Sequence, residues 1–334
     1  MNTDFTPIIS VIIPCYNVAS YIKNCLNSVL SQTFMSFEII CVIDGSTDNT
    51  YEIIEQFNDN RIRVIHQINR GLAGARNTGI NASRGLYVAL LDADDLWLPS
   101  KLETHFKHLQ LNPDVGISYC ASEFINEQGL RLGIGQYPKL KDISPKDIFC
   151  RNPIGNGSAP VIRKSLLNYI ARIKKAGYFT RNEYFNESMR QSEDVEFWLR
   201  IALTTDYKFE GINEALTLYR VNMSGLSANL EKQYELWLYS ANQNKNLNPE
   251  FIKKWFSLAS AYQKRYLARR AVQARNSNAA CKLMREALFQ DLRILFEEPK
   301  RTLLTLTCSL LCSLPKRLYD SLESVGMHFQ HRPM

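Results

Sequence analysis

Residues 8–44 are I-I-S-V-I-I-P-C-Y-N-V-A-S-Y-I-K-N-C-L-N-S-V-L-S-Q-T-F-M-S-F-E-I-I-C-V-I-D. The runs at 8–13 and 37–43 are almost entirely apolar and rich in β-branched side chains, which is typical of strands covered on both faces. Between them, apolar side chains recur every three or four positions, which predicts a helix capped by Ser20: Tyr21, Ile22, Cys25, Leu26, Val29 and Leu30. The stretch therefore predicts a strand–helix–strand unit.

The same alternation continues through residue 91. Capping residues at 46–50 precede a helical stripe of Ile53, Ile54 and Phe57, and three further segments predict a short strand, a helix packed through small residues and a fourth strand: 62–65, 71–82 and 86–91. Strands that alternate with helices imply a mostly parallel sheet with right-handed crossovers. We therefore expect an α/β fold.

The 334 residues exceed the usual size of one domain. A fifth apolar run at 115–120 leads into a less regular stretch, 121–190, which is followed by a predicted helix at 192–205. Beyond Ser227 the composition is helical throughout. We divide the chain into two halves of an α/β domain, 1–227, and a helical C-terminal region: 1–120, 121–227 and 228–334.

The composition, 45% apolar and 22% charged, fits a globular protein and excludes a disordered chain. The eight cysteines have no C-x-x-C pair or metal-type spacing, so we interpret them as reduced core residues. No apolar run reaches the roughly 18–20 residues that a membrane-spanning helix needs. The first ten residues do not resemble a secretion signal. We expect a cytosolic protein.

The net charge of +7 is uneven, because residues 251–334 hold 15 Lys or Arg against 6 Asp or Glu. Such a basic tail is typical of contact with a membrane surface or a nucleic acid, or of a solvated helical face. The apolar segment 302–314, flanked by basic pairs at 300–301 and 316–317, is too short to span a bilayer. An interfacial helix on anionic lipid and a packed hairpin or dimer contact remain as alternatives.

Polar residues follow the predicted strands where each one ends. In parallel sheets, ligands bind at the carboxyl ends of the strands, so we expect the loops at 14–17, 44–47 and 92–95 to meet at one rim. Asp92, Asp94 and Asp95 would repel one another unless a cation neutralised them. Their hard oxygen ligands favour Mg²⁺ or Mn²⁺, and an acidic turn capping the next helix is the alternative.

The other candidate motifs are ambiguous when taken singly. Residues 44–48 suit a turn or a helix cap as well as a ligand site. The glycine-rich run at 69–79 lacks the spacing of a dinucleotide-binding or P-loop motif. Glu193 and Asp194 fall in the first turn of a predicted helix, where acids offset the helix dipole whatever the function. The order of all these motifs along the chain is what distinguishes a functional site from ordinary turns and helix caps.

That order resembles family 2 glycosyltransferases, which have the GT-A fold, over roughly residues 8–227. The matching motifs are V-I-I-P-C-Y-N at 11–17, S-V-L-S-Q-T at 28–33, F-E-I-I-C-V-I-D-G-S-T-D-N-T at 37–50, N-R-G-L-A-G-A-R-N-T-G at 69–79, G-L-Y-V-A-L-L-D-A-D-D-L-W at 85–97, E-D-V-E-F-W-L-R at 193–200 and Y-R at 219–220. The resemblance implies an inverting transferase that moves a sugar from a nucleotide donor to a hydroxyl.

The resemblance also implies roles for residues on the donor side. Tyr16 would stack on the nucleotide base, with Pro14 and Asn17 shaping the loop around it. Asp44 would accept a hydrogen bond from the base, typically uracil. Arg76 would line the nucleotide site.

For the chemistry, the resemblance implies that Asp92 reaches the ribose or an ion-bound water and that Asp94 coordinates the metal, Mn²⁺ or Mg²⁺. Asp194 would be the general base, supported by Glu193. Asn222 stands where many relatives have a metal-binding histidine, and its carbonyl oxygen would serve as the ligand.

Two further features qualify the resemblance. Ile43 replaces the Asp or Asn of many relatives and so removes one polar contact to the nucleotide. Trp97 and Trp198 are predicted to lie in the core, not on an acceptor platform.

The resulting hypothesis is a cytosolic transferase, peripheral at the inner face of the cell membrane, that acts in surface polysaccharide biosynthesis. Its acceptor is a glycan or a lipid-linked sugar. No nucleic-acid partner is expected, and the oligomeric state is open. One alternative is a nucleotide-sugar-binding module with little catalysis. A nucleotidyltransferase is disfavoured by the absence of a basic glycine-rich triphosphate loop. A processive synthase is disfavoured by the absence of membrane spans and of a Q-x-x-R-W sequence.

Overall fold

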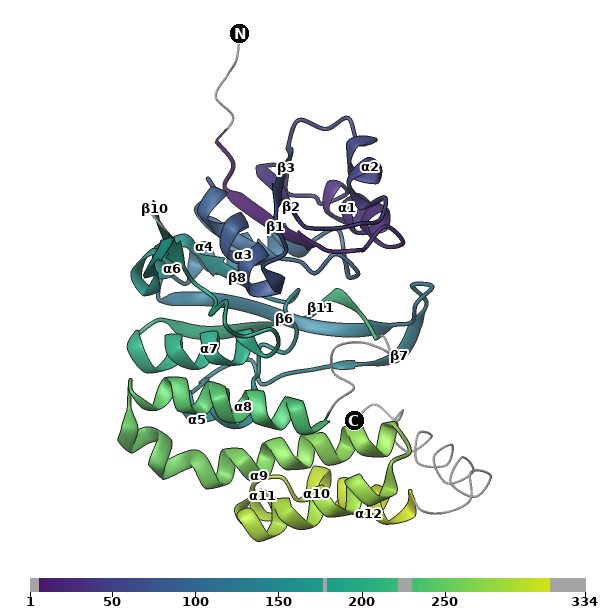
Figure 1. The fold of residues 1–334 in the computed structure, drawn as a ribbon, viewed down its shortest axis with the longest axis vertical. Helices are drawn as coiled ribbons and strands as arrows, with labels where there is room; N and C mark the ends of the chain where they lie inside the picture. Colours follow the sequence, from purple (N-terminus) through teal and green to yellow (C-terminus); the bar gives the residue numbers. More distant parts are fainter. Residues whose placement is uncertain (1–5, 177–178, 222–229, 313–334) are drawn as a thin grey trace.

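The computed structural model describes residues 6–176, 179–221 and 230–312 of the chain (Figure 1). The fold is α/β, with a curled, mostly parallel sheet and a helical C-terminal region. Four parallel strands form its first half in the order β3-β2-β1-β4: β1 (Ile9–Cys15), β2 (Phe37–Asp44), β3 (Ile62–Gln67) and β4 (Tyr87–Leu90). The helices that join them are α1 (Ile22–Leu30), α2 (Thr50–Glu55) and α3 (Gly71–Ala82).

The predicted strands and helices of this half are confirmed to within a few residues, and α3 has the predicted bounds. One detail was wrong. The residue that precedes α1 as its N-cap is Tyr21, which makes no side-chain capping bond, so Ser20 does not cap the helix. The buried residues of α1 are those of the predicted apolar stripe, because this face packs into the same core as β1 and β2.

The second half extends the sheet through β8, β6, β11 and β5. Strands β6 (Val115–Ile125) and β11 (Lys208–Arg220) run parallel to each other. Three short strands run antiparallel to their neighbours: β5 (Leu96–Trp97), β7 (Arg131–Gln136) and β8 (Val161–Arg163). A separate hairpin consists of β9 (Arg172–Ala176) and β10 (Phe179–Glu183). The helices that accompany this second half of the sheet are α4 (Lys101–Leu111), α5 (Pro145–Arg151), α6 (Lys164–Ile170) and α7 (Glu193–Thr204).

The C-terminal region consists of helices stacked beneath α7 and α5 (Figure 1). They are α8 (Leu230–Lys245), α9 (Pro249–Gln273), α10 (Ser277–Gln290), α11 (Arg293–Glu297) and α12 (Pro299–Leu311). Trp237 of α8 stacks on Phe149 of α5 with ring centroids 5.6 Å apart. One apolar cluster therefore continues from the sheet into these helices.

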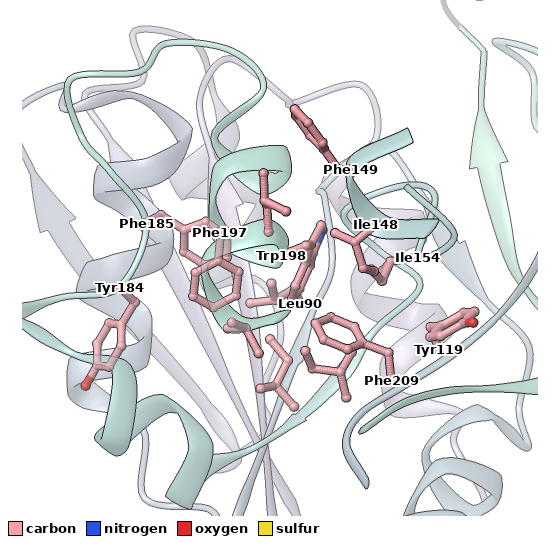
Figure 2. Close-up of a cluster of buried hydrophobic side chains, with 14 of the residues drawn as sticks. Leu90, Tyr119, Ile148, Phe149, Ile154, Tyr184, Phe185, Phe197, Trp198 and Phe209 are labelled. Carbon is pink, nitrogen blue, oxygen red and sulfur yellow. The ribbon is translucent and has the colours of Figure 1, made fainter. Parts of the chain in front are cut away.

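Both predicted core tryptophans are confirmed as buried. Figure 2 shows Trp198 surrounded by Leu90, Phe197 and Phe209, side chains that come from β4, α7 and β11. All eight cysteines lie within the described ranges as free thiols, and six of them are buried. Among the described residues, no helix is both long and apolar enough to cross a bilayer.

Candidate active site

The loops after β1 and β2 are joined by hydrogen bonds at the predicted rim. The amide of Asn17 donates to Ser46 Oγ at 3.2 Å, and its side-chain oxygen accepts from the amide of Thr47 at 2.8 Å. Asn17 has a φ of 52°, a left-handed conformation that asparagine adopts more readily than most residues. Tyr16, next to it, is 53% exposed, so its ring is free to meet a ligand. Pro14 lies within β1 and is only partly exposed.

Asp44 ends β2 and is buried. Its Oδ1 accepts from Gln67 Nε2 at 2.6 Å and from the amide of Arg70 at 2.8 Å. Burial nevertheless raises the pKa of this carboxyl, even though the Gln67 bond acts in the opposite direction. Ile43, before it, points into the apolar cluster formed with β1 and α1.

The three acids after β4 have different partners. Asp95 is fully buried and accepts from the amide of Arg220 at 2.8 Å and from Ser158 Oγ at 2.6 Å. Asp92 Oδ1 accepts from Arg76 Nη2 at 2.7 Å. No described side chain donates to the carboxylate of Asp94. Burial and the neighbouring Asp92 raise the pKa of Asp94 to about 6, although the nearby Arg220 opposes this rise.

Arg76, on α3, joins the two halves of the site. Its Nη1 donates to Glu193 Oε1 at 2.7 Å, while Nη2 holds Asp92. The residue is only 2% exposed, and its guanidinium lies over the ring of Phe185. Its observed partners are thus two acids, and the predicted contact with a nucleotide stays a prediction.

Glu193 and Asp194 open α7, and the preceding Ser192 has a φ of 58°. Burial raises the pKa of Glu193 to about 7; Arg76 opposes this rise and Asp194 adds to it. Burial also raises the pKa of Asp194, with Arg76 opposing and Asp92 adding. Because Arg76 is bonded to both Asp92 and Glu193, the acids after β4 lie beside the first turn of α7, which also contains Asp194.

The donor set fits a divalent cation held by few protein ligands. Among the described residues, no three His, Cys, Asp or Glu side chains converge on one point. Mg²⁺ and Mn²⁺ in phosphate sites commonly take one or two carboxylates together with substrate phosphates, and Asp94 supplies one carboxylate that accepts no hydrogen bond from a side chain in the described part of the chain. Asn222, the second predicted ligand, lies outside the described residues.

Several site residues were missed by the sequence analysis because they lie in the stretch 121–190, which shows no clear pattern. A Cβ on Gly157 would lie 2.3 Å from Arg76 Nη2 and 2.8 Å from Asp92 Oδ2, so a larger residue there requires these side chains to shift. Ser158 Oγ accepts from the amide of Asp92 at 2.9 Å while donating to Asp95. Their only signal in the sequence is the small-residue run G-N-G-S at 155–158.

Comparison with known proteins gives the site a family. The sequence model of the family described as "Glycosyl transferase family 2" matches residues 10–170. The chain is 31% identical over 233 residues to the uncharacterized glycosyltransferase MJ1057 of Methanocaldococcus jannaschii. The aligned segment covers 68% of this chain and 76% of that protein. The chain belongs to glycosyltransferase family 2. It is therefore a glycosyltransferase, and it spans about a third of the length of the longer relatives from Rickettsia.

Two solved structures share the fold. TarS 1–349 from S. aureus, solved with UDP, has a TM-score of 0.58 at 19% identity and covers 91% of this chain and 90% of its own. The mannosyltransferase PcManGT from Pyrobaculum calidifontis, solved with GDP-Man and Mn²⁺, has a TM-score of 0.57 at 21% identity and covers 95% of this chain and 88% of its own. These similarities extend beyond residue 227 and support the GT-A architecture.

Proposed function

We propose that this family 2 enzyme transfers a sugar from a uridine diphosphate donor, with inversion, to a hydroxyl of a glycan or lipid-linked acceptor. The observation that carries the proposal is the guanidinium of Arg76 bonded at 2.7 Å to both Asp92 and Glu193. This contact joins the acids that follow the donor-side strand to the acids that begin α7. A donor and an acceptor bound at these two places would meet between them.

The donor side suits a nucleotide. An exposed Tyr16 ring stands beside a loop fixed by Asn17, and Asp44 lies at the end of the neighbouring strand. The TarS structures solved with UDP and UDP-GlcNAc support a uridine donor, whereas PcManGT was solved with GDP-Man. The choice of uridine rests on Asp44, whose remaining acceptor capacity suits the N–H of uracil.

The acceptor side suits inversion in one step. Asp194 would take the proton of the acceptor hydroxyl while that oxygen forms a bond to the anomeric carbon and the bond from that carbon to the phosphate oxygen breaks. Such general-base assistance contributes about 10²- to 10⁴-fold to the rate. Mn²⁺ or Mg²⁺ held by Asp94, and by Asn222 as its second proposed ligand, would stabilise the charge that gathers on the leaving diphosphate. The raised pKa of Asp194 makes it a stronger base than an ordinary aspartate.

The test uses the whole chain with UDP-Glc, UDP-GlcNAc and GDP-Man in Mn²⁺ or Mg²⁺. We expect one uridine donor to be hydrolysed slowly without an acceptor, and both Asp94→Asn and Asp194→Asn to abolish this hydrolysis. Asp291→Asn, which removes a surface pair with Arg293, is the matched control and keeps it. Donor binding seen as thermal stabilisation without any hydrolysis would favour the alternative, a nucleotide-sugar-binding module.

We also propose a peripheral membrane contact, at the inner face of the cell membrane, in surface polysaccharide biosynthesis. Apolar side chains on α10–α12 and the turns between them face solvent, a set we call the C-terminal apolar face: Phe289, Leu292, Phe296, Leu303, Leu304 and Leu310. Lys300 and Arg301 are exposed and stand between Phe296 and Leu303 in the sequence, and apolar surface combined with basic residues suits anionic lipid. The basic pair at 316–317, also predicted for this contact, lies outside the described residues.

A further inference from the structure

Residues 69–77, N-R-G-L-A-G-A-R-N, begin α3 and contain four polar side chains. Each of the four contacts residues 184–193, which lead into α7 and end at Glu193; we call this segment the α7 entry loop. Arg76 holds Glu193 itself, as described above. The other three side chains contact earlier residues of the loop.

Asn77 fixes the beginning of the α7 entry loop. Its Oδ1 accepts from the amides of Tyr184 and Phe185, at 3.1 and 2.8 Å, and its Nδ2 donates to the carbonyl oxygen of Phe185 at 2.8 Å. Asn77 is fully buried, so these bonds are shielded from water. A buried amide with this many partners permits only one arrangement of the backbone it binds.

Glu187 fixes the middle of the loop. Its carboxylate pairs with Arg70 of the α3 start, with Lys174 of β9 and with Arg181 of β10, whose two nitrogens each lie 2.6 Å from a carboxylate oxygen. Burial alone would raise the pKa of Glu187, but the bonds from Asn77 and Arg181 outweigh it and lower that pKa. Farther along, Arg190 Nη1 donates to Asn69 Oδ1 at 3.2 Å.

The same α3 residues contact the donor side. The amide of Arg70 donates to Asp44 Oδ1, and Asn69 Nδ2 donates to the carbonyl oxygen of Asp44 at 3.0 Å. The start of α3 is thus hydrogen-bonded on one side to the proposed base-recognition residue, Asp44, and on the other to the α7 entry loop, which immediately precedes Asp194.

We propose that Glu187 and Asn77 are positioning residues: through Arg70 and the start of α3 they hold the α7 entry loop so that Asp194 stays aligned with the sugar of a bound donor. Glu187 acts in this proposal only through the residues that it pairs with. Its effect is on the reaction rate, because a misplacement of about 1 Å costs on the order of 10²-fold in catalysis. The inference rests on the proposed function, since it requires Asp194 to be the base.

The test compares Glu187→Gln with Glu38→Gln. Glu38 is a fully buried carboxylate near the start of β2, at the end away from Asp44, where it accepts from Ser10 Oγ at 2.8 Å, from Arg63 Nη1 at 2.7 Å and from the amide of Arg84 at 2.7 Å. With the nucleotide sugar that the wild type turns over, we expect Glu187→Gln to lower kcat about 10²-fold. The Kd for UDP should stay within about threefold by calorimetry, Glu187→Asp should recover part of kcat, and Glu38→Gln should keep kcat.

A second measurement does not depend on activity. Hydrogen exchange of a peptide covering 184–192 should become faster in Glu187→Gln and stay unchanged in Glu38→Gln. An unchanged exchange rate, or an unchanged kcat in Glu187→Gln, overturns the inference. If the wild type transfers and hydrolyses none of the sugars while Glu187→Gln still loosens the loop, the proposed function fails and the structural link stands.

Discussion

Arg76 is the residue on which the electrostatics of the site depend most. It is paired with both Asp92 and Glu193, and the side chains of Arg76 and Glu193 are almost fully buried while that of Asp92 is 25% exposed. Removing one member of a buried ion pair leaves an uncompensated charge, which costs about 3–5 kcal/mol. The residue therefore affects stability and the protonation of the acids together.

Arg76→Gln should move the acid limb of the kcat–pH profile to higher pH. A general base works only when ionised, so activity is lost as pH falls through its pKa. Burial already raises the pKa of Asp194 and Arg76 opposes that rise, so losing Arg76 raises the pKa further. Donor hydrolysis measured across pH checks this. Arg61→Gln, which breaks a pair with Asp59 away from the site, is the control, and an acid limb that does not move contradicts the prediction.

Gly157→Ala should lower kcat by about 10²-fold, because the new methyl group would push Arg76 off Asp92. Steady-state kinetics on donor hydrolysis, with the melting temperature measured in parallel, gives the readout. A variant with wild-type kcat would mean that the guanidinium moves aside without consequence.

The acids of the site could be found from sequence, because they follow apolar strands or begin a helix and occur in a recognisable order. Glu187 and Gly157 could not. Each acts through a partner more than eighty residues away along the chain, and neither lies in a periodic segment. The sequence carries no local trace of such pairings.

At the scale of elements, apolar runs identified β1, β2 and β4, which are covered on both faces, and also the partly exposed edge strand β3. Strand β11 was not predicted. Its sequence, K-F-E-G-I-N-E-A-L-T-L-Y-R, contains polar residues at irregular positions, and its register against β6 shifts three times. Bulges break the alternation on which strand prediction depends. Strand β7 was not predicted for a different reason. Its first four residues are exposed, so the strand buries no apolar face that would give an alternating pattern.

Helix α3 packs against β1 through Gly79, where a Cβ would lie 2.3 Å from Ile12 Cγ2. Gly79→Ala should therefore destabilise the protein by about 1–3 kcal/mol through overpacking. The better helix propensity of alanine offsets about 1 kcal/mol of this cost. Urea unfolding of both proteins measures the difference, and equal or greater stability of the variant would show that Ile12 can shift without cost.

At the scale of the molecule, the C-terminal apolar face should bind anionic vesicles. Replacing Phe289 and Phe296, which are 85% and 79% exposed, by serine removes most of its aromatic surface. We expect the double variant to lose at least about tenfold in binding to vesicles that contain phosphatidylglycerol, measured by flotation. Tyr169→Ser on α6, an equally solvated aromatic elsewhere, should bind as the wild type does. Undiminished flotation of the double variant would refute the contact.

The stacking of Trp237 on Phe149 has a practical consequence for anyone who trims this enzyme. A fragment that stopped near residue 227 would keep every acid of the described site and yet leave the ring of Phe149, together with the adjoining apolar side chains of α5 and α7, bare to water. Such fragments tend to aggregate during expression. The helices after α7 thus cover apolar side chains of the domain that contains the site. We expect the shortest soluble version of the enzyme to retain α8 and α9.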